Sequence, residues 1–200
     1  MKKIRLAIFV SGSGTNAEAI MTYFQNHSRI DVAVVLSNNS EAYALQRAKK
    51  FSVPSKFFTK NQFQNGVVNQ WLGEYRVTHI VLAGFLWLIP EKILSAYPNR
   101  IINIHPSLLP KFGGKGMYGQ NVHEAVVAAK EQETGITIHE VNEQYDEGKI
   151  LAQAKCTISS ADTAPLVAAK VLKLEHEYYP KIIERWATSS GDQPIQILPL

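Results

Sequence analysis

The chain has one cysteine among 200 residues, so it has no internal disulfide. A chain without disulfides suits a reducing compartment, and we expect a cytoplasmic protein. The thiol belongs to Cys156, which follows the apolar segment Ile150-Leu151-Ala152. No residues that activate a catalytic thiol surround it, so we expect a buried and inert side chain.

Long hydrophobic segments are also missing. The apolar run after Lys2 and Lys3 ends at Val10, which is at the short limit for a signal peptide, and no A-x-A cleavage site follows. The longest other apolar stretch, Ile80 to Pro90, is too short to span a bilayer. We therefore expect neither a signal peptide nor a membrane partner.

Charge is neither abundant nor concentrated. Charged residues make up 19% of the chain, and the formal net charge of +4 comes from scattered basic residues with no arginine-rich run. Nucleic-acid binding is therefore not favoured, although the small positive excess is compatible with an anionic ligand. The apolar fraction of 46% is ordinary for a globular protein, and 200 residues suit one α/β domain.

Strand patterns alternate with helical patterns through the first half of the chain. The continuous apolar run Ile4–Val10, followed by a glycine-rich break, is typical of a buried parallel strand. Ser40 is a candidate N-cap, and Pro90 lies where the first turn of a short helix begins. We expect strands over Ile4–Val10, Val32–Leu36, His79–Ala83 and Ile101–Ile104, and helices over Ala17–Phe24, Glu41–Phe51 and Thr59–Leu72. This alternation predicts an α/β fold, a doubly wound, mostly parallel sheet with helices on both faces.

The pattern changes in the second half. Two strand-like segments, Ile136–Val141 and Ile150–Thr157, are joined by a polar turn and predict a hairpin or a mixed extension of the sheet. Asp162 is placed to cap a long terminal helix over Ala164–Trp186.

A glycine-rich turn follows the first expected strand. Residues 12–17, Gly-Ser-Gly-Thr-Asn-Ala, match the dinucleotide-binding fingerprint, in which glycines let the backbone approach an anion at a helix N-terminus. That fingerprint also needs a carboxylate at the end of the second strand, where this chain has Leu36-Ser37-Asn38-Asn39. The turn therefore predicts a phosphate site without a dinucleotide. A tight turn with no ligand stays open as the alternative.

An asparagine and a histidine stand at the end of the fourth expected strand. Asn103 and His105 are two residues apart, so both side chains point to the same face, where the strands of parallel sheets present ligand sites. An amide donor and an imidazole suit the oxyanion that forms when a carbonyl is attacked. A purely structural role stays open for both. Asp146 lies in a turn, where aspartate is usually a turn former, and no spacing connects it to His105.

Four motifs together resemble the folate-dependent formyltransferases. They are residues 11–16 after the first strand, Leu82-Ala83-Gly84-Phe85 after the third, residues 103–110 (Asn-Ile-His-Pro-Ser-Leu-Leu-Pro) and residues 146–151 (Asp-Glu-Gly-Lys-Ile-Leu). The third string is highly specific for this superfamily, and the resemblance spans residues 4 to 186. It implies a single formyltransferase domain over residues 1–188 with a C-terminal tail over residues 189–200, which we expect to add little to the core.

The resemblance implies transfer of the formyl group of 10-formyltetrahydrofolate to the amine of glycinamide ribonucleotide in purine biosynthesis. By motif, the catalytic residues are Asn103, His105 and Asp146. The acceptor site is Gly14, Thr15, Asn16 and Glu175, and the folate site is Lys60, Leu86, Trp87, Leu88, Ile89 and Asn103. No metal is expected, since His123 and His139 form no ligand set with His105 and no zinc spacing occurs. We expect small-molecule substrates, no nucleic acid, and a monomer or weak homodimer.

Two places depart from the family pattern. Trp87 stands where relatives often have arginine, at the rim of the folate pocket. Residues 112–119, Phe-Gly-Gly-Lys-Gly-Met-Tyr-Gly, replace a Pro-Gly-x-His-like stretch in a loop that faces the acceptor in the family. These changes bear on the choice of folate and acceptor more than on the chemistry. Variation between lineages without functional effect stays open as the alternative.

Three other functions are compatible with this fold. A formyltransferase for methionyl-tRNA or for an amino sugar shares the chemistry, but the former carries a C-terminal nucleic-acid domain, which we do not expect here. A folate-dependent deformylase uses the same three residues on water and usually carries an extra N-terminal domain, which we also do not expect. A non-catalytic binding module would not need Asn103, His105 and Asp146 together.

Overall fold

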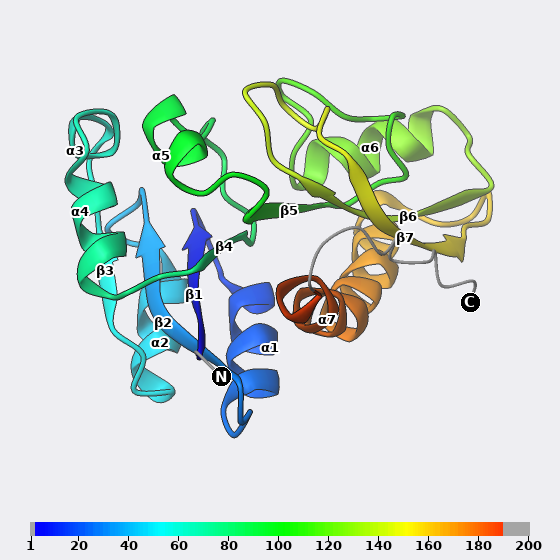
Figure 1. Cartoon of the computed structure of the whole chain (residues 1–200). Helices are drawn as coiled ribbons and strands as arrows, with labels where there is room; N and C mark the ends of the chain where they lie inside the picture. Colours follow the sequence, from blue (N-terminus) through cyan, green and yellow to red (C-terminus); the bar gives the residue numbers. More distant parts are fainter. Residues whose placement is uncertain (1–2, 190–200) are drawn as a thin grey trace. The chain divides into compact units, whose positions relative to one another are not determined.

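The computed structural model describes residues 3–189. The chain divides into two compact units, Met1–Ile102 and Asn103–Leu200, and its seven strands follow the order β3-β2-β1-β4-β5-β6-β7 (Figure 1). The single domain expected over residues 1–188 stays a prediction. Apart from Ser189, the expected tail lies outside the described residues. Within residues 3–189, no helix combines the length and the apolar composition needed to cross a membrane.

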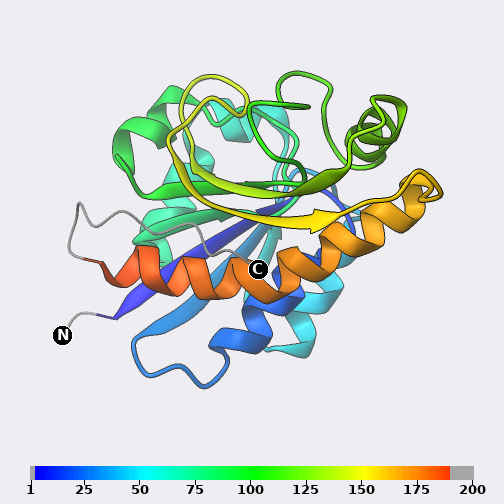
Figure 2. The ribbon, with the colours of Figure 1, turned by 90° about the vertical axis from the view of Figure 1, so that its right-hand side faces the viewer.

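The first unit is a parallel sheet with helices on both faces. Its elements are β1 (Ile4–Val10), α1 (Thr15–Phe24), β2 (Ile30–Ser37), α2 (Tyr43–Lys50), β3 (Ser55–Phe57), α3 (Lys60–Gln64), α4 (Val67–Glu74), β4 (His79–Leu82), α5 (Glu91–Ala96) and the start of β5 (Ile101–His105). Strands β2 and β4 both pair with β1 in parallel, and β3 pairs with β2 in parallel. Helices α1 and α2 lie on one face and α4 and α5 on the other (Figure 2). The doubly wound α/β fold is thereby confirmed.

The second unit is built around an antiparallel hairpin. It holds the end of β5, then α6 (Gln120–Ala128), β6 (Glu133–Glu140), β7 (Ile150–Thr157) and the long helix α7 (Ala164–Thr188). Strand β6 pairs with β7 in antiparallel fashion, which confirms the expected hairpin and makes the sheet mixed. Helix α7 packs against β6, β7 and α6.

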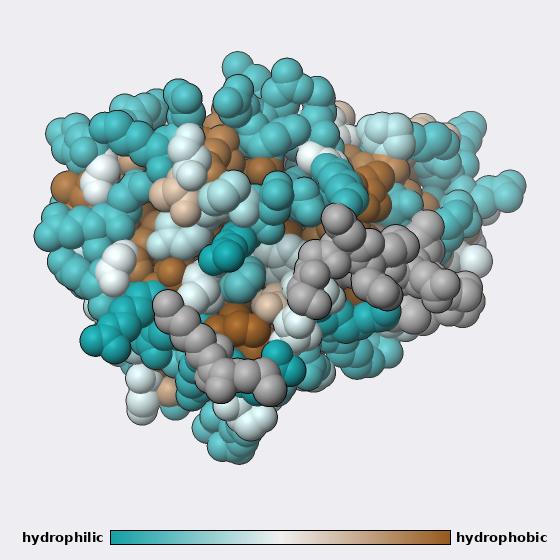
Figure 3. Space-filling view, viewed as in Figure 1, coloured by the Kyte–Doolittle hydropathy of each residue, from teal (hydrophilic) through white to brown (hydrophobic). Residues whose placement is uncertain are grey.

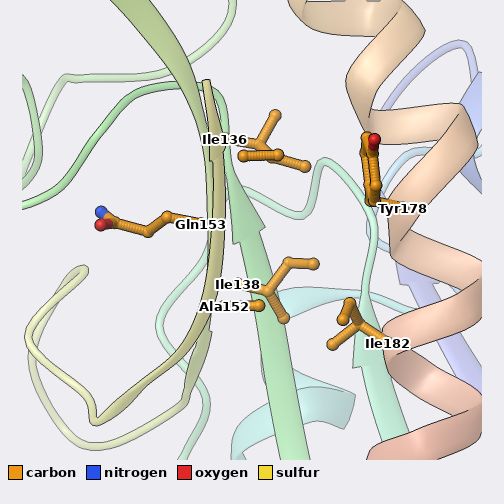
Figure 4. A pocket seen from close by; sticks show the side chains of 7 residues that line it. Ile136, Ile138, Ala152, Gln153, Tyr178 and Ile182 are labelled. Atoms are coloured by element: carbon orange, nitrogen blue, oxygen red, sulfur yellow. The ribbon is translucent and has the colours of Figure 1, made fainter. Parts of the chain in front are cut away.

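Each unit has an apolar layer that the strand patterns explain. In β1, residues 6–10 are completely buried, as expected for a central parallel strand covered on both faces. In the hairpin the side chains alternate. Ile136 and Ile138 point toward Tyr178 and Ile182 of α7, whereas Gln153 points to the opposite side (Figure 4). Because successive strand residues face opposite ways, this register directs Gln153 away from the core.

One predicted helix is wrong, and the local backbone conformation explains why. The segment Thr59–Leu72 forms two helices, because Asn65 ends α3 and Gly66, with φ 97°, begins α4 in a left-handed conformation. Glycine adopts this conformation without strain, so the chain turns there. The hydroxyl of Thr59 accepts a hydrogen bond from the Gln62 amide and forms a capping box for α3.

The two predicted side-chain caps are wrong. Helix α2 begins after Ala42, without a side-chain cap, so Ser40 is not its N-cap residue. Helix α7 begins after Thr163, and the carboxylate of Asp162 instead accepts hydrogen bonds from the Ser159 amide and from Lys170. The ammonium group of Lys170 is a stronger partner for the Asp162 carboxylate than the backbone amides at the start of α7, since charge-assisted hydrogen bonds between two ions are stronger than those to a neutral donor.

The lone cysteine is less enclosed than expected. Cys156 lies on β7 and is half-buried rather than buried. Burial still raises the pKa of its thiol; the charge of Lys170 lowers that pKa to a smaller extent, and the charge of Asp162 raises it. A raised pKa reduces the thiolate fraction at neutral pH, which agrees with an inert thiol.

His79, at the start of β4, makes the stability of the fold depend on pH. Burial, and secondly the charge of Arg100, lower the pKa of His79 to about 4. Because the folded-state pKa lies below that of the unfolded chain, this histidine destabilises the fold as pH falls from about 6.5 toward 4. Between pH 7 and 4.5 we expect the wild type to lose about 2 kcal/mol of unfolding free energy more than His79→Gln does. Urea unfolding at both pH values measures this difference, and parallel pH dependence in the two proteins would refute it.

Candidate active site

The chain leaving β5 is held in place by the hairpin. The hydroxyl of Thr137 on β6 donates to the Ser107 carbonyl at 2.6 Å and accepts from the Leu109 amide at 2.9 Å. Gln153 on β7 donates to the same hydroxyl and to the Leu109 carbonyl. These buried hydrogen bonds fix the segment that follows His105, and therefore the direction in which β5 presents its last side chains.

The structure brings Asp146 to His105. Asp146 lies between β6 and β7 with φ 58°, a left-handed conformation that aspartate tolerates better than most residues. Its Oδ2 atom is 3.4 Å from Nδ1 of His105 and accepts a hydrogen bond from the Gly114 amide at 2.9 Å. Its Oδ1 atom is 3.5 Å from Nε2 of His139. The carboxylate that looked like a turn former therefore contacts two histidines.

Both ring nitrogens of His105 lie beside an oxygen atom. Its Nε2 atom donates to the carbonyl of Phe112 at 2.8 Å, because a carbonyl can only accept. Its Nδ1 atom faces the carboxylate of Asp146, which favours a proton there as well. The ring is almost completely buried, with 4% of its side chain exposed. An imidazolium paired with a carboxylate is thus the arrangement that satisfies both ring nitrogens.

Asp146 is held ionised by its neighbours. Burial by itself would raise the pKa of its carboxyl. The side chain of His105, through hydrogen bonding and through its charge, the contact with His139 and the Gly114 amide together outweigh burial and bring that pKa well below its usual range. The carboxylate is therefore charged across the physiological pH range and supplies the negative charge that His105 needs.

The third predicted catalytic residue, Asn103, is contacted by a histidine that the sequence reasoning considered only as a metal ligand. The Nδ2 atom of Asn103 is 3.2 Å from Nε2 of His139. The signal was present in β6, because Thr137 and His139 are two residues apart and so share a face that turns to the segment after β5. In the described part of the chain no cluster of three or more His, Cys, Asp or Glu side chains is placed to hold a metal ion.

The unusual loop at residues 112–119 supports His105 and Asp146 through its backbone. The Phe112 carbonyl accepts from His105, and the Gly114 amide donates to Asp146. Between them, a Cβ atom on Gly113 would lie 2.5 Å from the end of the Leu109 side chain and 3.4 Å from the Cβ atom of Asp146, so a side chain there would require Leu109 to shift. The departure from the family pattern thus lies directly against the histidine and the aspartate.

The glycine-rich turn of the first unit is held by α2. Gly14 has φ 73° and begins α1 without a side-chain cap. Arg47 donates to the Ser13 carbonyl at 2.9 Å and forms an ion pair with Glu18 in the first turn of α1. A Cβ atom on Gly14 would lie 2.4 Å from that of Ala44, so glycine is required there by packing as well as by φ.

The end of β2 differs from that of a dinucleotide-binding protein. The hydroxyl of Ser37 and the amide of Asn39 are hydrogen-bonded to each other, and the side chain of Asn39 donates to the Ser11 carbonyl at 3.3 Å. An amide that braces the turn thus lies where a ribose-binding carboxylate would be needed.

The residues matched to the folate site differ in their exposure and in their packing. Leu86 and Leu88 are exposed, by 43% and 42%, whereas Ile89 is buried, and the Leu86 amide donates to the Ser11 hydroxyl at 3.0 Å. The ring of Trp87 packs in an aromatic cluster with Phe58, Phe63 and Phe85. Lys60, at the start of α3, is exposed.

The visible surface is mainly hydrophilic, with apolar residues in separate patches (Figure 3). Leu86 and Leu88 are two of the large apolar side chains that are exposed in the described part of the chain. In the second unit Glu175, matched to the acceptor site, lies on α7 with only 9% exposure. Burial, and then the charge of Glu175, raise the pKa of Tyr179.

Comparison with known proteins agrees with this fold. Residues 4–183 match the formyl transferase family, and the chain belongs to that family. It is 38% identical over 192 residues to phosphoribosylglycinamide formyltransferase of Bacillus subtilis, covering 92% of this chain and 94% of that protein. It is 40% identical over 190 residues to the chloroplastic phosphoribosylglycinamide formyltransferase of Vigna unguiculata.

The match to the plant proteins is partial in length. The aligned region covers 92% of this chain but 61% of the Vigna protein, and 91% of this chain but 65% of the one from Arabidopsis thaliana. Among solved structures, phosphoribosylglycinamide formyltransferase from Anaplasma phagocytophilum is 31% identical, with a TM-score of 0.86 and 99% of both chains covered.

Proposed function

We propose that the chain transfers the formyl group of 10-formyltetrahydrofolate to the amine of glycinamide ribonucleotide, giving formylglycinamide ribonucleotide and tetrahydrofolate in purine biosynthesis. The observation that carries this proposal is the cluster of Asn103, His105 and Asp146, which the fold assembles from β5 and a distant turn. Relatives of matching length that are named for this reaction support it. We place the reaction in the cytoplasm and expect a monomer or weak homodimer.

In the mechanism, the acceptor amine attacks the formyl carbon and a tetrahedral intermediate forms with a negative oxygen. Asn103 and the imidazolium of His105 donate hydrogen bonds to this oxygen, and one such donor contributes about 10²–10³ in rate. In the structure the Nε2–H group of His105 donates to the Phe112 carbonyl. During the reaction this group donates to the oxyanion instead. Catalytic hydrogen bonds commonly tighten only when substrate is bound.

Two protons move in this reaction. The attacking amine loses one, which Asp146 accepts through a water molecule. The departing folate nitrogen gains one from His105 or from a water relay. The low pKa of Asp146 makes it a weak base, so its main part is electrostatic: a carboxylate that stays ionised favours the imidazolium form of His105. No metal is required.

Substrate binding is assigned residue by residue. The turn at Gly14, Thr15 and Asn16 holds the acceptor's phosphate, because α1 presents its N-terminal amides and its positive dipole end there. Glu175 contacts the acceptor's ribose. The folate site is formed by Lys60, Leu86, Trp87, Leu88, Ile89 and Asn103.

A substitution in the turn tests the phosphate site. Gly14→Val adds a branched side chain at a positive φ and against Ala44, so the backbone that faces the phosphate must move. We expect the Kd for glycinamide ribonucleotide to rise at least about tenfold and the Kd for the folate to stay within about threefold. Calorimetric titration with each ligand separately measures both. Equal losses would make the turn a purely structural element, and unchanged affinities would remove it from the site.

A panel of acceptors tests the function as a whole. With 10-formyltetrahydrofolate as donor, kcat/KM is measured for glycinamide ribonucleotide, an amino-sugar nucleotide and water. We expect glycinamide ribonucleotide to exceed the other two by at least about 10³-fold, the range reached when polar groups of a substrate are specifically recognised. A preference for the amino sugar or for water would replace the proposal by one of those two activities.

A further inference from the structure

His139 is a buried side chain whose two nitrogens both have partners in the catalytic cluster or beside it. It lies near the end of β6 and is 2% exposed. Its Nδ1 atom donates to the carbonyl of Glu140 at 2.8 Å. Its Nε2 atom is 3.2 Å from Nδ2 of Asn103 and 3.5 Å from Oδ1 of Asp146.

The protonation of this ring follows from its partners. Nδ1 must carry a proton, because the carbonyl of Glu140 can only accept. A second proton on Nε2 would place two imidazolium rings, His139 and His105, against the single carboxylate of Asp146. An excess buried charge is costly, so the neutral ring is favoured. Neutral His139 has a lone pair on Nε2, and that lone pair accepts one of the two Nδ2 protons of Asn103.

This contact decides which way the Asn103 amide faces. An asparagine amide has nearly the same shape when it is flipped, so only its hydrogen bonds determine where its donors point. We infer that His139 is a positioning residue: it holds Nδ2 of Asn103 in place, so that the second Nδ2 proton is presented to the oxyanion. Without it, the amide can turn its carbonyl oxygen toward the developing negative charge. The inference rests on the proposed formyl transfer.

The hairpin holds His139 in this orientation. The backbone amide of Glu140 donates to the Lys149 carbonyl at 2.9 Å, which ties the end of β6 to the start of β7. Gly148 approaches so closely that a Cβ atom there would lie 1.6 Å from the Glu140 carbonyl oxygen, the acceptor that fixes the His139 ring. The turn that carries Asp146 therefore also fixes the second histidine.

Two substitutions at position 139 distinguish a hydrogen-bond acceptor from a side chain that only fills space. His139→Leu keeps an apolar side chain of similar size and removes the acceptor, whereas His139→Gln retains an oxygen near the place of Nε2. We expect His139→Leu to lower kcat about 10- to 50-fold with KM for both substrates within about threefold, because a mispositioned donor loses part of what an oxyanion donor contributes. His139→Gln should restore kcat to within about fivefold of wild type. Thr134→Val, a buried hydroxyl removed from the same strand, is the matched control and should keep wild-type kcat.

A double-mutant cycle with Asn103→Ala identifies the path. If His139 acts through Asn103, His139→Leu has no further effect on kcat in the Asn103→Ala background. An undiminished effect there, or wild-type kcat in His139→Leu, would overturn the inference. The side-chain amide of Asn103 gives a readout independent of turnover: by NMR, one Nδ2 proton should exchange slowly in wild type and His139→Gln and rapidly in His139→Leu. Equal exchange in wild type and His139→Leu would also overturn it.

Failure of the proposed function would look different. In that case wild type does not formylate glycinamide ribonucleotide, while the amide-exchange pattern of Asn103 still reports whether His139 orients it. Should His139→Leu not fold, slow exchange in wild type and in His139→Gln supports the inference, and fast exchange in wild type refutes it.

Discussion

His105→Ala is expected to lower kcat for formyl transfer by at least about 10²-fold, the size typical of a general acid or an oxyanion donor. The ring is almost wholly enclosed and both of its nitrogens are engaged, by Asp146 and by the Phe112 carbonyl. Alanine removes the proton donor and leaves the carboxylate of Asp146 without its nearest cation. Steady-state kinetics measures the loss, with circular dichroism to confirm that the variant is folded.

Asp146→Asn should act through the same histidine. An amide keeps the shape of the carboxylate but removes the charge that favours imidazolium, so we expect the double variant to be little worse than His105→Ala alone. Strictly additive losses in kcat would mean that the two residues act independently. Near wild-type turnover in His105→Ala would refute the mechanism and leave a binding module as the better interpretation.

Asp146→Asn should also change the pH dependence of stability. The folded-state pKa of this carboxyl is lowered, so the carboxylate stabilises the fold above the unfolded-state pKa of about 4, and this contribution is lost as pH falls below it. The variant lacks that contribution at neutral pH, and its kinetics are therefore compared at a temperature at which both proteins are fully folded.

Gly148→Ala is expected to lower the free energy of unfolding by about 3 kcal/mol or more and to reduce kcat in the fraction that folds. A Cβ atom at this position would lie 1.6 Å from the oxygen and 2.6 Å from the carbon of the Glu140 carbonyl, and neither can move without separating β6 from β7. The displaced carbonyl is the partner of His139, so the contacts of His139 with Asn103 and Asp146 are disturbed as well.

Urea unfolding measures this effect, with Gly73→Ala as the control. Gly73 lies in α4 and has no atom within 4 Å of the added methyl group, so alanine there should leave stability unchanged or raise it by up to about 1 kcal/mol. Similar unfolding free energies for the two variants would show that the hairpin tolerates a side chain at Gly148, and the close packing described here would be wrong.

Strong periodic signals in the sequence sufficed to predict the main elements of the fold. The apolar run of β1 is completely buried, and the two alternating segments of the second half pair as β6 and β7. Short elements had no such signal. Strand β3 is only three residues long, and α6 begins after a glycine, Gly119, without a side-chain cap. Neither length nor capping chemistry marked these two elements.

The candidate site was predictable only in part. The spacing of Asn103 and His105 on one strand placed their side chains on one face, because strand geometry repeats every two residues. The approach of Asp146 depends on the turn between β6 and β7 and on the Gly114 amide, and no local pattern encodes a contact across 41 residues. The resemblance to a family supplied that contact. His139 was visible in the sequence, but its role depends on the same long-range packing.

The fate of the formyl carbon tests the central claim most directly. The protein is incubated with glycinamide ribonucleotide and 10-formyltetrahydrofolate labelled with ¹³C in the formyl group, and the products are followed by NMR and mass spectrometry. We expect one labelled formyl group on the acceptor nitrogen for each tetrahydrofolate released, and no turnover in His105→Ala on the same timescale. Labelled formate in place of labelled acceptor, or tetrahydrofolate release that does not depend on His105, would contradict the account.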